Sequence, residues 1–332
     1  MFLVMRFDFR NPAFAGTLMA DRYEAALDIA EWADGLGIPV SIILHEHHGS
    51  ADGYIPSPAL IVAAMAARTK NVRFMIGAVL APFHDPLRIA EDWCVLDHLT
   101  RGRADPIIGG GYAPSEFAMF DVPLKERPKR VSELAVTLRA AFQGKPFEYR
   151  GRTVHITPEP YRPGGPPVLM GGASEGAARR AARLGDGFIP SQPEVWEFYR
   201  DEMIKLGKPD PGPGGGDGSV VTALAADPGR GWEAMGSYFL YETNAYCAWK
   251  DAAAEASPYD VFPDVATLRQ ANRYNVITPA EMVERLGAAP VAAPVAQFHP
   301  LCGGMPIDLA WQSLQLFENE VLPAFRKEEG GA

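Results

Sequence analysis

The stretch NVRFMIGAVLAPFHDPLRIAEDWCVLDHLTRGRADPIIGGGY, residues 71–112, decides the fold that we expect for this chain. Residues 71–81 form an apolar run of strand length, and residues 85–100 then show the spacing of an amphipathic helix. A second apolar run follows and ends in the glycines at 109–111. This order of strand, helix and strand indicates an α/β architecture built from repeating units.

The same alternation extends along the rest of the chain. Strands are predicted at 3–10, 38–46, 71–81, 102–112, 166–172, 186–191, 220–227 and 295–299. Helices are predicted at 19–37, 57–69, 85–100, 127–143, 174–185, 193–207, 279–287 and 306–325. Eight strand–helix units in a chain of 332 residues match a (β/α)8 TIM barrel in count and size. An open doubly wound sheet in two domains is the alternative, but FDFRNPAFAG at 7–16 lacks the GxGxxG pattern of such folds.

We expect one barrel domain over residues 1–332, with three interruptions. Residues 144–165 contain FEYRGRTVHIT, which has the pattern of a β-hairpin. Residues 207–219 are rich in proline and glycine and predict a flexible surface loop. Residues 228–275 contain a long aromatic-rich segment, which we interpret as a helical insertion that shapes a pocket.

Composition and charge limit the classes of partner. The formal net charge is −10 and basic residues occur only in short groups, so nucleic-acid and anionic membrane surfaces are disfavoured as partners. The longest apolar runs are too short to span a bilayer, and the N-terminus lacks the pattern of a secretion signal. Cys94, Cys247 and Cys302 are widely separated, which is typical of unpaired thiols in a reducing compartment. We therefore expect a cytoplasmic protein that acts on a small molecule.

The segment ILHEHHGSADGY at 43–54 places three histidines and a glutamate at the end of the second predicted strand. In a barrel, the chemistry lies where strands end and the following loops begin. Because side chains alternate along an extended chain, His45 and His47 point to one side, and Glu46 and His48 to the other.

Two kinds of chemistry can use such histidines. The HxH pair is half of many metal sites, so a metal-dependent barrel hydrolase is one hypothesis. The later strand ends offer only His299 and Asp227 as further ligands, so we expect no metal here. The other hypothesis is a strand-end histidine that acts as a hydrogen-bond donor or as an acid–base group near neutral pH.

A glycine-containing turn marks a candidate anion site. VLMGGASEGAARR at 168–180 is an apolar strand, two glycines and a helix that starts near Ser174. Because Gly171, Gly172 and Ala173 carry little side chain, the N–H groups at this helix N-terminus are open to a phosphate. An ordinary glycine-containing turn is the alternative interpretation.

Four segments of the sequence resemble the bacterial luciferase-like family of flavin-dependent oxidoreductases. They are EHH at 46–48, the segment from the third helix to the loop after strand four at 85–120, PPVLMGGASEGAARRAARLGDGF at 166–188, and GGMPIDLAWQSLQLFENEVLPAF at 303–325. They occur in the family's order and span nearly the whole chain. The resemblance implies the same (β/α)8 barrel that the strand count predicts.

Carried over to this sequence, the resemblance makes His47 the active-site histidine beside the flavin ring and gives His48 a structural role. Gly77–Ala78 matches the place where such barrels carry a non-prolyl cis peptide against the flavin. The glycines and small residues after strand five match the family's phosphate loop.

One departure concerns the positive charge near the phosphate. Bacterial luciferase has an arginine at the end of strand four, whereas this sequence has Gly110 there, so Arg127 or Arg130 is the candidate partner. The cofactor-binding candidates are Gly77, Ala78, Gly110, Tyr112, Arg127, Arg130, Gly171, Gly172, Ala173 and Ser174. The substrate-pocket candidates are His45, His48, His299 and Trp249.

The function that the resemblance implies is a monooxygenase that uses reduced FMN and O₂ on a small hydrophobic organic substrate. A separate flavin reductase as partner and a homodimer are expected. A deazaflavin-dependent oxidoreductase that transfers hydride is the alternative within this fold. A metal-dependent hydrolase and a non-catalytic flavin-binding barrel are the remaining hypotheses.

Overall fold

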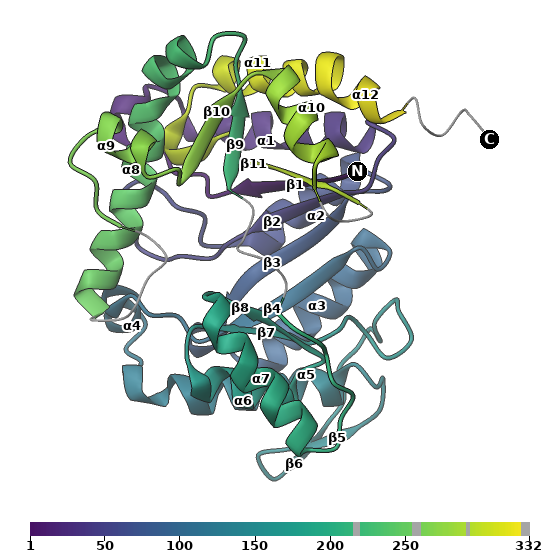
Figure 1. The fold of residues 1–332 in the computed structure, drawn as a ribbon. Helices are drawn as coiled ribbons and strands as arrows, with labels where there is room; N and C mark the ends of the chain where they lie inside the picture. The colour runs from purple at the N-terminus through teal and green to yellow at the C-terminus, as the bar shows by residue number, and fades with distance from the viewer. Residues whose placement is uncertain (215–219, 254–259, 290–292, 327–332) are drawn as a thin grey trace.

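A computed structural model describes residues 1–214, 220–253, 260–289 and 293–326 (Figure 1). Parallel strands form one curled sheet in the order β11–β1–β2–β3–β4–β7–β8. These strands are Phe2–Phe7 (β1), Val40–Leu44 (β2), Arg73–Leu80 (β3), Ala104–Gly109 (β4), Leu169–Gly172 (β7), Gly187–Pro190 (β8) and Val295–Phe298 (β11). The prediction of a TIM-barrel-like α/β fold is confirmed.

Helices follow the strands and pack around the sheet (Figure 1). They are Met19–Asp34 (α1), Pro58–Arg68 (α2), Pro86–Thr100 (α3), Arg127–Ala141 (α5), Glu175–Leu184 (α6), Trp196–Lys205 (α7), Pro279–Gly287 (α10), Ile307–Leu316 (α11) and Leu322–Arg326 (α12). A short helix, Pro114–Met119 (α4), lies in the loop after β4, and a π-helical turn, Phe317–Val321, joins α11 to α12. The main core fills the space between the sheet and these helices.

Residues at both ends of α3 explain where this helix begins and ends. The carboxylate of Asp85 accepts hydrogen bonds from the backbone N–H groups of Leu87, at 3.0 Å, and Arg88, at 3.1 Å. Pro86 occupies the first helical position, where its missing N–H costs nothing. The helix ends at Arg101, which takes a left-handed conformation with φ of 50°.

A pair of parallel strands, Val221–Leu224 (β9) and Tyr274–Ile277 (β10), forms its own hydrogen-bonded ladder, and β9 lies next to β11 of the main sheet. Eight barrel strands in succession were expected, but β9 pairs with β10 instead of joining the sheet of seven. The sequence does not predict β10, because a run of four residues is too short to show a period. This pair, α8 and α9 enclose a second, smaller core.

The three expected interruptions fall as follows. Phe147–Tyr149 (β5) and Arg152–Val154 (β6) form an antiparallel hairpin within residues 144–165. The prediction of a flexible loop at 207–219 lies partly outside the described residues, because 215–219 are not among them. Residues 228–275 contain the helices Pro228–Ala253 (α8) and Val265–Gln270 (α9).

Helix α8 determines what covers the site. It runs along the side of the sheet toward which β1 points and reaches α4 (Figure 1). In a parallel α/β sheet this is the carboxyl-terminal side, where ligand sites lie. Cys94, Cys247 and Cys302 are buried and form no disulfide with one another, as the sequence predicts.

Candidate active site

His47 is held by a buried carboxylate that the sequence did not single out. Its Nδ1 lies 2.8 Å from Oε1 of Glu116 on α4, and the same oxygen accepts the backbone N–H of His48 at 2.8 Å. Both His47 and Glu116 are buried. Since Oε1 of Glu116 acts as an acceptor toward the N–H of His48, the tautomer of His47 that fits this oxygen carries its hydrogen on Nδ1. This leaves Nε2 as the ring nitrogen that can take or give a proton.

Glu46 anchors the other side of residues 45–48, the segment after β2 that we call the histidine loop. Its Oε1 accepts hydrogen bonds from Nε2 of His48 and of His84, both at 2.8 Å, and its Oε2 accepts the N–H of Leu80 at 3.1 Å. Burial opposes ionisation, but the hydrogen bonds from His48 and His84 outweigh it and lower the pKa of Glu46 to about 2. Burial also opposes protonation of His84, yet the hydrogen bond to Glu46 raises its pKa above the ordinary value. The ring of His48 is thus tied to Glu46, a contact compatible with the structural role that the resemblance implies.

His45 contacts the backbone of strand β3. Its Nδ1 hydrogen-bonds to the carbonyl oxygen of Gly77, and Gly77–Ala78 is a non-prolyl cis peptide, which confirms that prediction. Desolvation and the charge of Arg6 lower the pKa of His45 to about 3, so the ring is neutral at pH 7. Its Nε2 is enclosed and has no hydrogen-bond partner among the described residues.

His299 belongs to a different group, which we call the Glu242 network. Nδ1 of His299 lies 3.2 Å from Oε1 of Glu242, and Sγ of Cys302 donates to Oε2 at 3.0 Å. The hydroxyl of Tyr274 also donates to Oε2, at 2.7 Å. Ligand atoms of Glu242, His299 and Cys302 all lie within 4.8 Å of one another, a spacing that could hold a metal ion.

The charge of the Glu242 network is already balanced by a side chain. The guanidinium of Arg6 pairs with Glu242 and lies 3.4 Å from Nδ1 of His299. It thereby supplies the positive charge that a metal would bring. His45 and His47 are bonded elsewhere, so the described residues do not assemble the HxH metal site of the hydrolase hypothesis.

The glycines at the end of β7 let helix α6 pack close against this strand. A Cβ at Gly172 would lie 2.4 Å from Cβ of Ala177, so only glycine fits here. Ser174 caps α6, with its hydroxyl accepting the N–H of Ala177 at 3.3 Å. Ala173 and Ser174 are exposed, and Gly171 is half-buried on β7. The N-terminus of α6 is therefore open to an anion.

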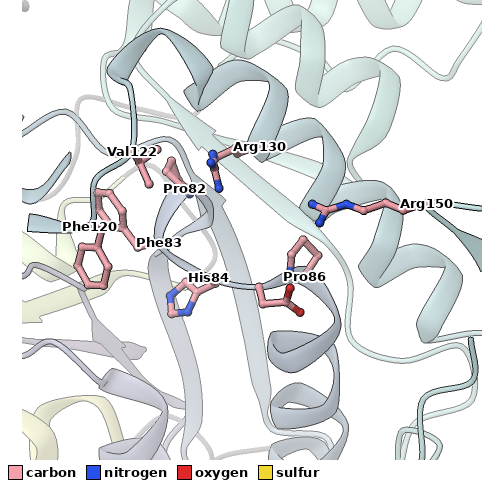
Figure 2. Close-up of a pocket in the computed structure, with 9 residues that line it drawn as sticks. Pro82, Phe83, His84, Pro86, Phe120, Val122, Arg130 and Arg150 are labelled. Atoms are coloured by element: carbon pink, nitrogen blue, oxygen red, sulfur yellow. The ribbon is translucent and has the colours of Figure 1, made fainter. Parts of the chain in front are cut away.

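Arg127 and Arg130, the two candidate partners of the phosphate, lie in different surroundings. A Cβ at Gly110 would lie 3.7 Å from Cδ of Arg127, whose Nη1 donates to the carbonyl oxygen of Gly111 at 3.2 Å. Arg127 thus fills the space beside the glycine run. Arg130 instead pairs with Glu126 at 3.1 Å and lines a cavity of about 300 Å³ together with Phe83 and other residues (Figure 2).

Three rings beside His47 form what we call the aromatic collar: Tyr54, Tyr246 and Trp249. Their centres are 6.1, 5.8 and 5.7 Å apart, and the hydroxyl groups of the two tyrosines lie 2.7 Å apart. The His47 ring centre lies 4.4 Å from that of Trp249 and 4.8 Å from that of Tyr54. Cζ of Arg10 lies 4.4 Å from Trp249 and 4.8 Å from each tyrosine ring. Tyr112 also contacts His47, with ring centres 5.6 Å apart.

Sequence reasoning missed Glu116, Arg10 and Glu242. Glu116 is the one acidic residue in YAPSEFAMF at 112–120, immediately after the glycine run, and its position was the available signal. Arg10 extends the first strand into the same region, but no local pattern relates it to residues of α8.

Comparisons with known proteins find a matching family and similar proteins that are named as monooxygenases. A family model described as luciferase-like monooxygenase matches residues 3–208. The chain is similar to 4-hydroxyprotoasukamycin monooxygenase of Streptomyces nodosus subsp. asukaensis, with 36% identity over 107 residues, 32% of this chain and 29% of that protein. It is also similar to limonene 1,2-monooxygenase of Rhodococcus erythropolis, with 34% identity over 104 residues, 31% of this chain and 27% of that protein. The chain matches about half, or less, of the length of such curated relatives.

Solved structures match over nearly the whole chain. Monooxygenase RslO1 from Streptomyces bottropensis has a TM-score of 0.75 and 25% identity, over 98% of this chain and 100% of that one. The oxygenating constituent of 3,6-diketocamphane monooxygenase from Pseudomonas putida, solved with FMN, has a TM-score of 0.73 and 22% identity, over 97% and 98%. None of the described helices is long and apolar enough to cross a membrane.

Proposed function

Because the chain belongs to the luciferase-like monooxygenase family, we propose that it is a flavin-dependent monooxygenase that uses reduced FMN and O₂ to oxygenate a small hydrophobic molecule. The family match includes the histidine loop and the N-terminus of α6. The observation that carries the proposal is the pair of His47 and Glu116 near the carboxyl ends of the parallel strands, where barrel enzymes place their chemistry.

The residues present fit a flavin phosphate and ring. The α6 N-terminus offers backbone N–H groups behind Gly172, where a Cβ has no room, and Arg127 lies beside the glycine run. The enclosed Nε2 of His45 is a hydrogen-bonding atom that a bound ring can satisfy. Gly77 and Ala78 then present backbone to the ring, as the resemblance implies.

When bound, reduced FMN supplies the electrons with which O₂ is activated for oxygen transfer. The chain's own residues would bind, orient and exclude water. Glu116 fixes the tautomer and plane of His47, so that Nε2 holds or transfers a proton at the substrate oxygen. The aromatic collar covers the ring of His47 and keeps water from the reacting atoms.

Two partner proposals follow from the same function. A separate flavin reductase would supply the reduced FMN, and two copies of the chain would form a homodimer. Three cysteines that form no disulfide favour a reducing compartment, and we place the enzyme in the cytoplasm.

Binding and oxygen consumption test the proposal together. Purified protein is titrated with reduced FMN and with a reduced deazaflavin, and O₂ uptake of the loaded protein is followed. We expect FMN to bind more tightly and oxygen to be consumed in a substrate-dependent reaction. His47→Ala should retain FMN binding and lose product formation. Tighter binding of the deazaflavin without O₂ uptake would favour hydride transfer instead, and binding of neither would overturn the proposal.

A further inference from the structure

The aromatic collar separates a buried cation from the active-site histidine. Arg10 and His47 each lie 4.4–4.8 Å from the centres of the Tyr54 and Trp249 rings. Tyr246 completes the triangle, 4.8 Å from Arg10 and 6.1 Å from His47. These distances place Arg10 and His47 on opposite sides of the triangle of ring centres, because on one side the two groups would overlap. Any group within the collar therefore lies between Arg10 and His47.

Arg10 has donor capacity that the described residues do not use. It is only 1% exposed, and its Nη1 pairs with Asp52. Its Nε lies 3.7 Å from Asp8, and neither Nε nor Nη2 has a hydrogen-bond partner among the described residues. Buried charged donors are normally satisfied, because leaving one unpaired carries the full cost of its desolvation. The collar is therefore equipped to receive an acceptor oxygen.

Trp249 is the member of the collar best placed to leave it. Tyr54 and Tyr246 are buried and joined through their hydroxyl groups. Trp249 is half-buried, and among the described residues it is held by ring contacts and the guanidinium of Arg10. Its indole occupies a slot for a flat bicyclic ring.

We propose that the aromatic collar is the substrate subsite and that Trp249 fills it until substrate binds. The occupant is a flat conjugated molecule that carries a carbonyl or hydroxyl oxygen, which accepts a hydrogen bond from Arg10. A flat ring in this position makes the same contacts with Arg10 and His47 that the indole makes. Its oxygen also accepts a charged hydrogen bond from Arg10, which the indole cannot do. The inference rests on the proposed function and deepens it by naming a substrate class.

Binding of aromatic probes to the purified full chain, without flavin, tests the subsite. The probes are 2-naphthol, naphthalene, which has the same shape without the oxygen, and decanal, which is flexible. Calorimetry should show that 2-naphthol binds at least about tenfold more tightly than naphthalene, the amount that one charged hydrogen bond supplies. Equal binding of the two, or tighter binding of decanal, would overturn the proposal.

Variants assign the effect to residues. Arg10→Met, and the neutral Arg10→Gln in case the first does not fold, should reduce the preference for 2-naphthol over naphthalene about tenfold, while Arg285→Met on the exposed face of α10 should not. Trp249→Ala should bind both aromatic probes more tightly than wild type, and Trp249→Phe should lie between. An unchanged preference in Arg10→Met or Arg10→Gln, or weaker probe binding in Trp249→Ala, would contradict the assignment.

Failure of this inference and failure of the proposed function give different results. Probe binding that depends on Arg10, in a protein that binds no reduced FMN, would leave the subsite standing and remove the monooxygenase proposal. FMN binding and substrate-dependent O₂ uptake, with no effect of Arg10 on probe binding, would do the reverse.

Discussion

Replacing Glu46 by glutamine should cost stability in an amount that depends on pH. Glu46 is 3% exposed and accepts hydrogen bonds from His48, His84 and Leu80. Its pKa falls from 4.5 to about 2, a difference of 4.5 − 2 = 2.5. At about 1.4 kcal/mol for each unit, the ionised carboxylate contributes about 3 kcal/mol to the free energy of unfolding. Glutamine keeps the shape but cannot supply the charge.

The sign of the pH dependence follows from the lowered pKa. The contribution of Glu46 is fully present above pH 4.5, the unfolded value, and is lost as pH falls toward about 2. Urea unfolding should therefore separate wild type from Glu46→Gln by about 3 kcal/mol at pH 6 and by about 2 kcal/mol at pH 3.5. Glu284→Gln, an exposed position, is the control and should change little. A difference that stays constant or grows on acidification would refute this reasoning.

Three further predictions concern the site and its support. Glu116→Ala should lower the rate of oxygenation about tenfold to hundredfold while FMN affinity stays within about threefold, because Glu116 acts only through the orientation of His47; equal loss of both would contradict this. Gly172→Ala should weaken FMN binding at least about tenfold in a flavin titration, whereas Gly176→Ala, where a Cβ meets nothing within 4 Å, should not. Tyr274→Phe should lower the free energy of unfolding by about 2 kcal/mol in urea, because it removes a hydrogen bond to a buried carboxylate, and no change would show that the bond is dispensable.

The parts of the fold that repeat could be predicted from the sequence. The strands and helices within residues 71–112 appear in the structure because each is long enough to show its own period and α3 has its cap next to it. β10 could not be found in this way, since its strand status depends on pairing with β9, which lies about fifty residues earlier. Tertiary pairing, which the local pattern does not encode, decided where the sheet of seven ends.

In the site, too, local sequence predicts some features, and others depend on residues that are far apart in the chain. Strand alternation, which depends only on neighbouring residues, predicted that His47 and His48 point to opposite sides, and in the structure their rings bond to different carboxylates, those of Glu116 and Glu46. The group that fixes His47 is 69 residues away, and the two tyrosines of the aromatic collar are 192 residues apart. Pairings at such separations need the assembled fold, so the position of Glu116 after the glycine run did not reveal its partner, and no local pattern marked Arg10.

The two carboxylates that hold residues 45–48, those of Glu46 and Glu116, explain why His47 is the fixed element of the site and Trp249 the replaceable one. Glu46 anchors the loop to β3 and Glu116 holds His47 itself, so displacing that ring would leave buried hydrogen-bonding groups unpaired. Displacing Trp249 breaks ring contacts that any flat molecule can restore. A site built in this way keeps its acid–base group in place while its covering ring exchanges with substrate.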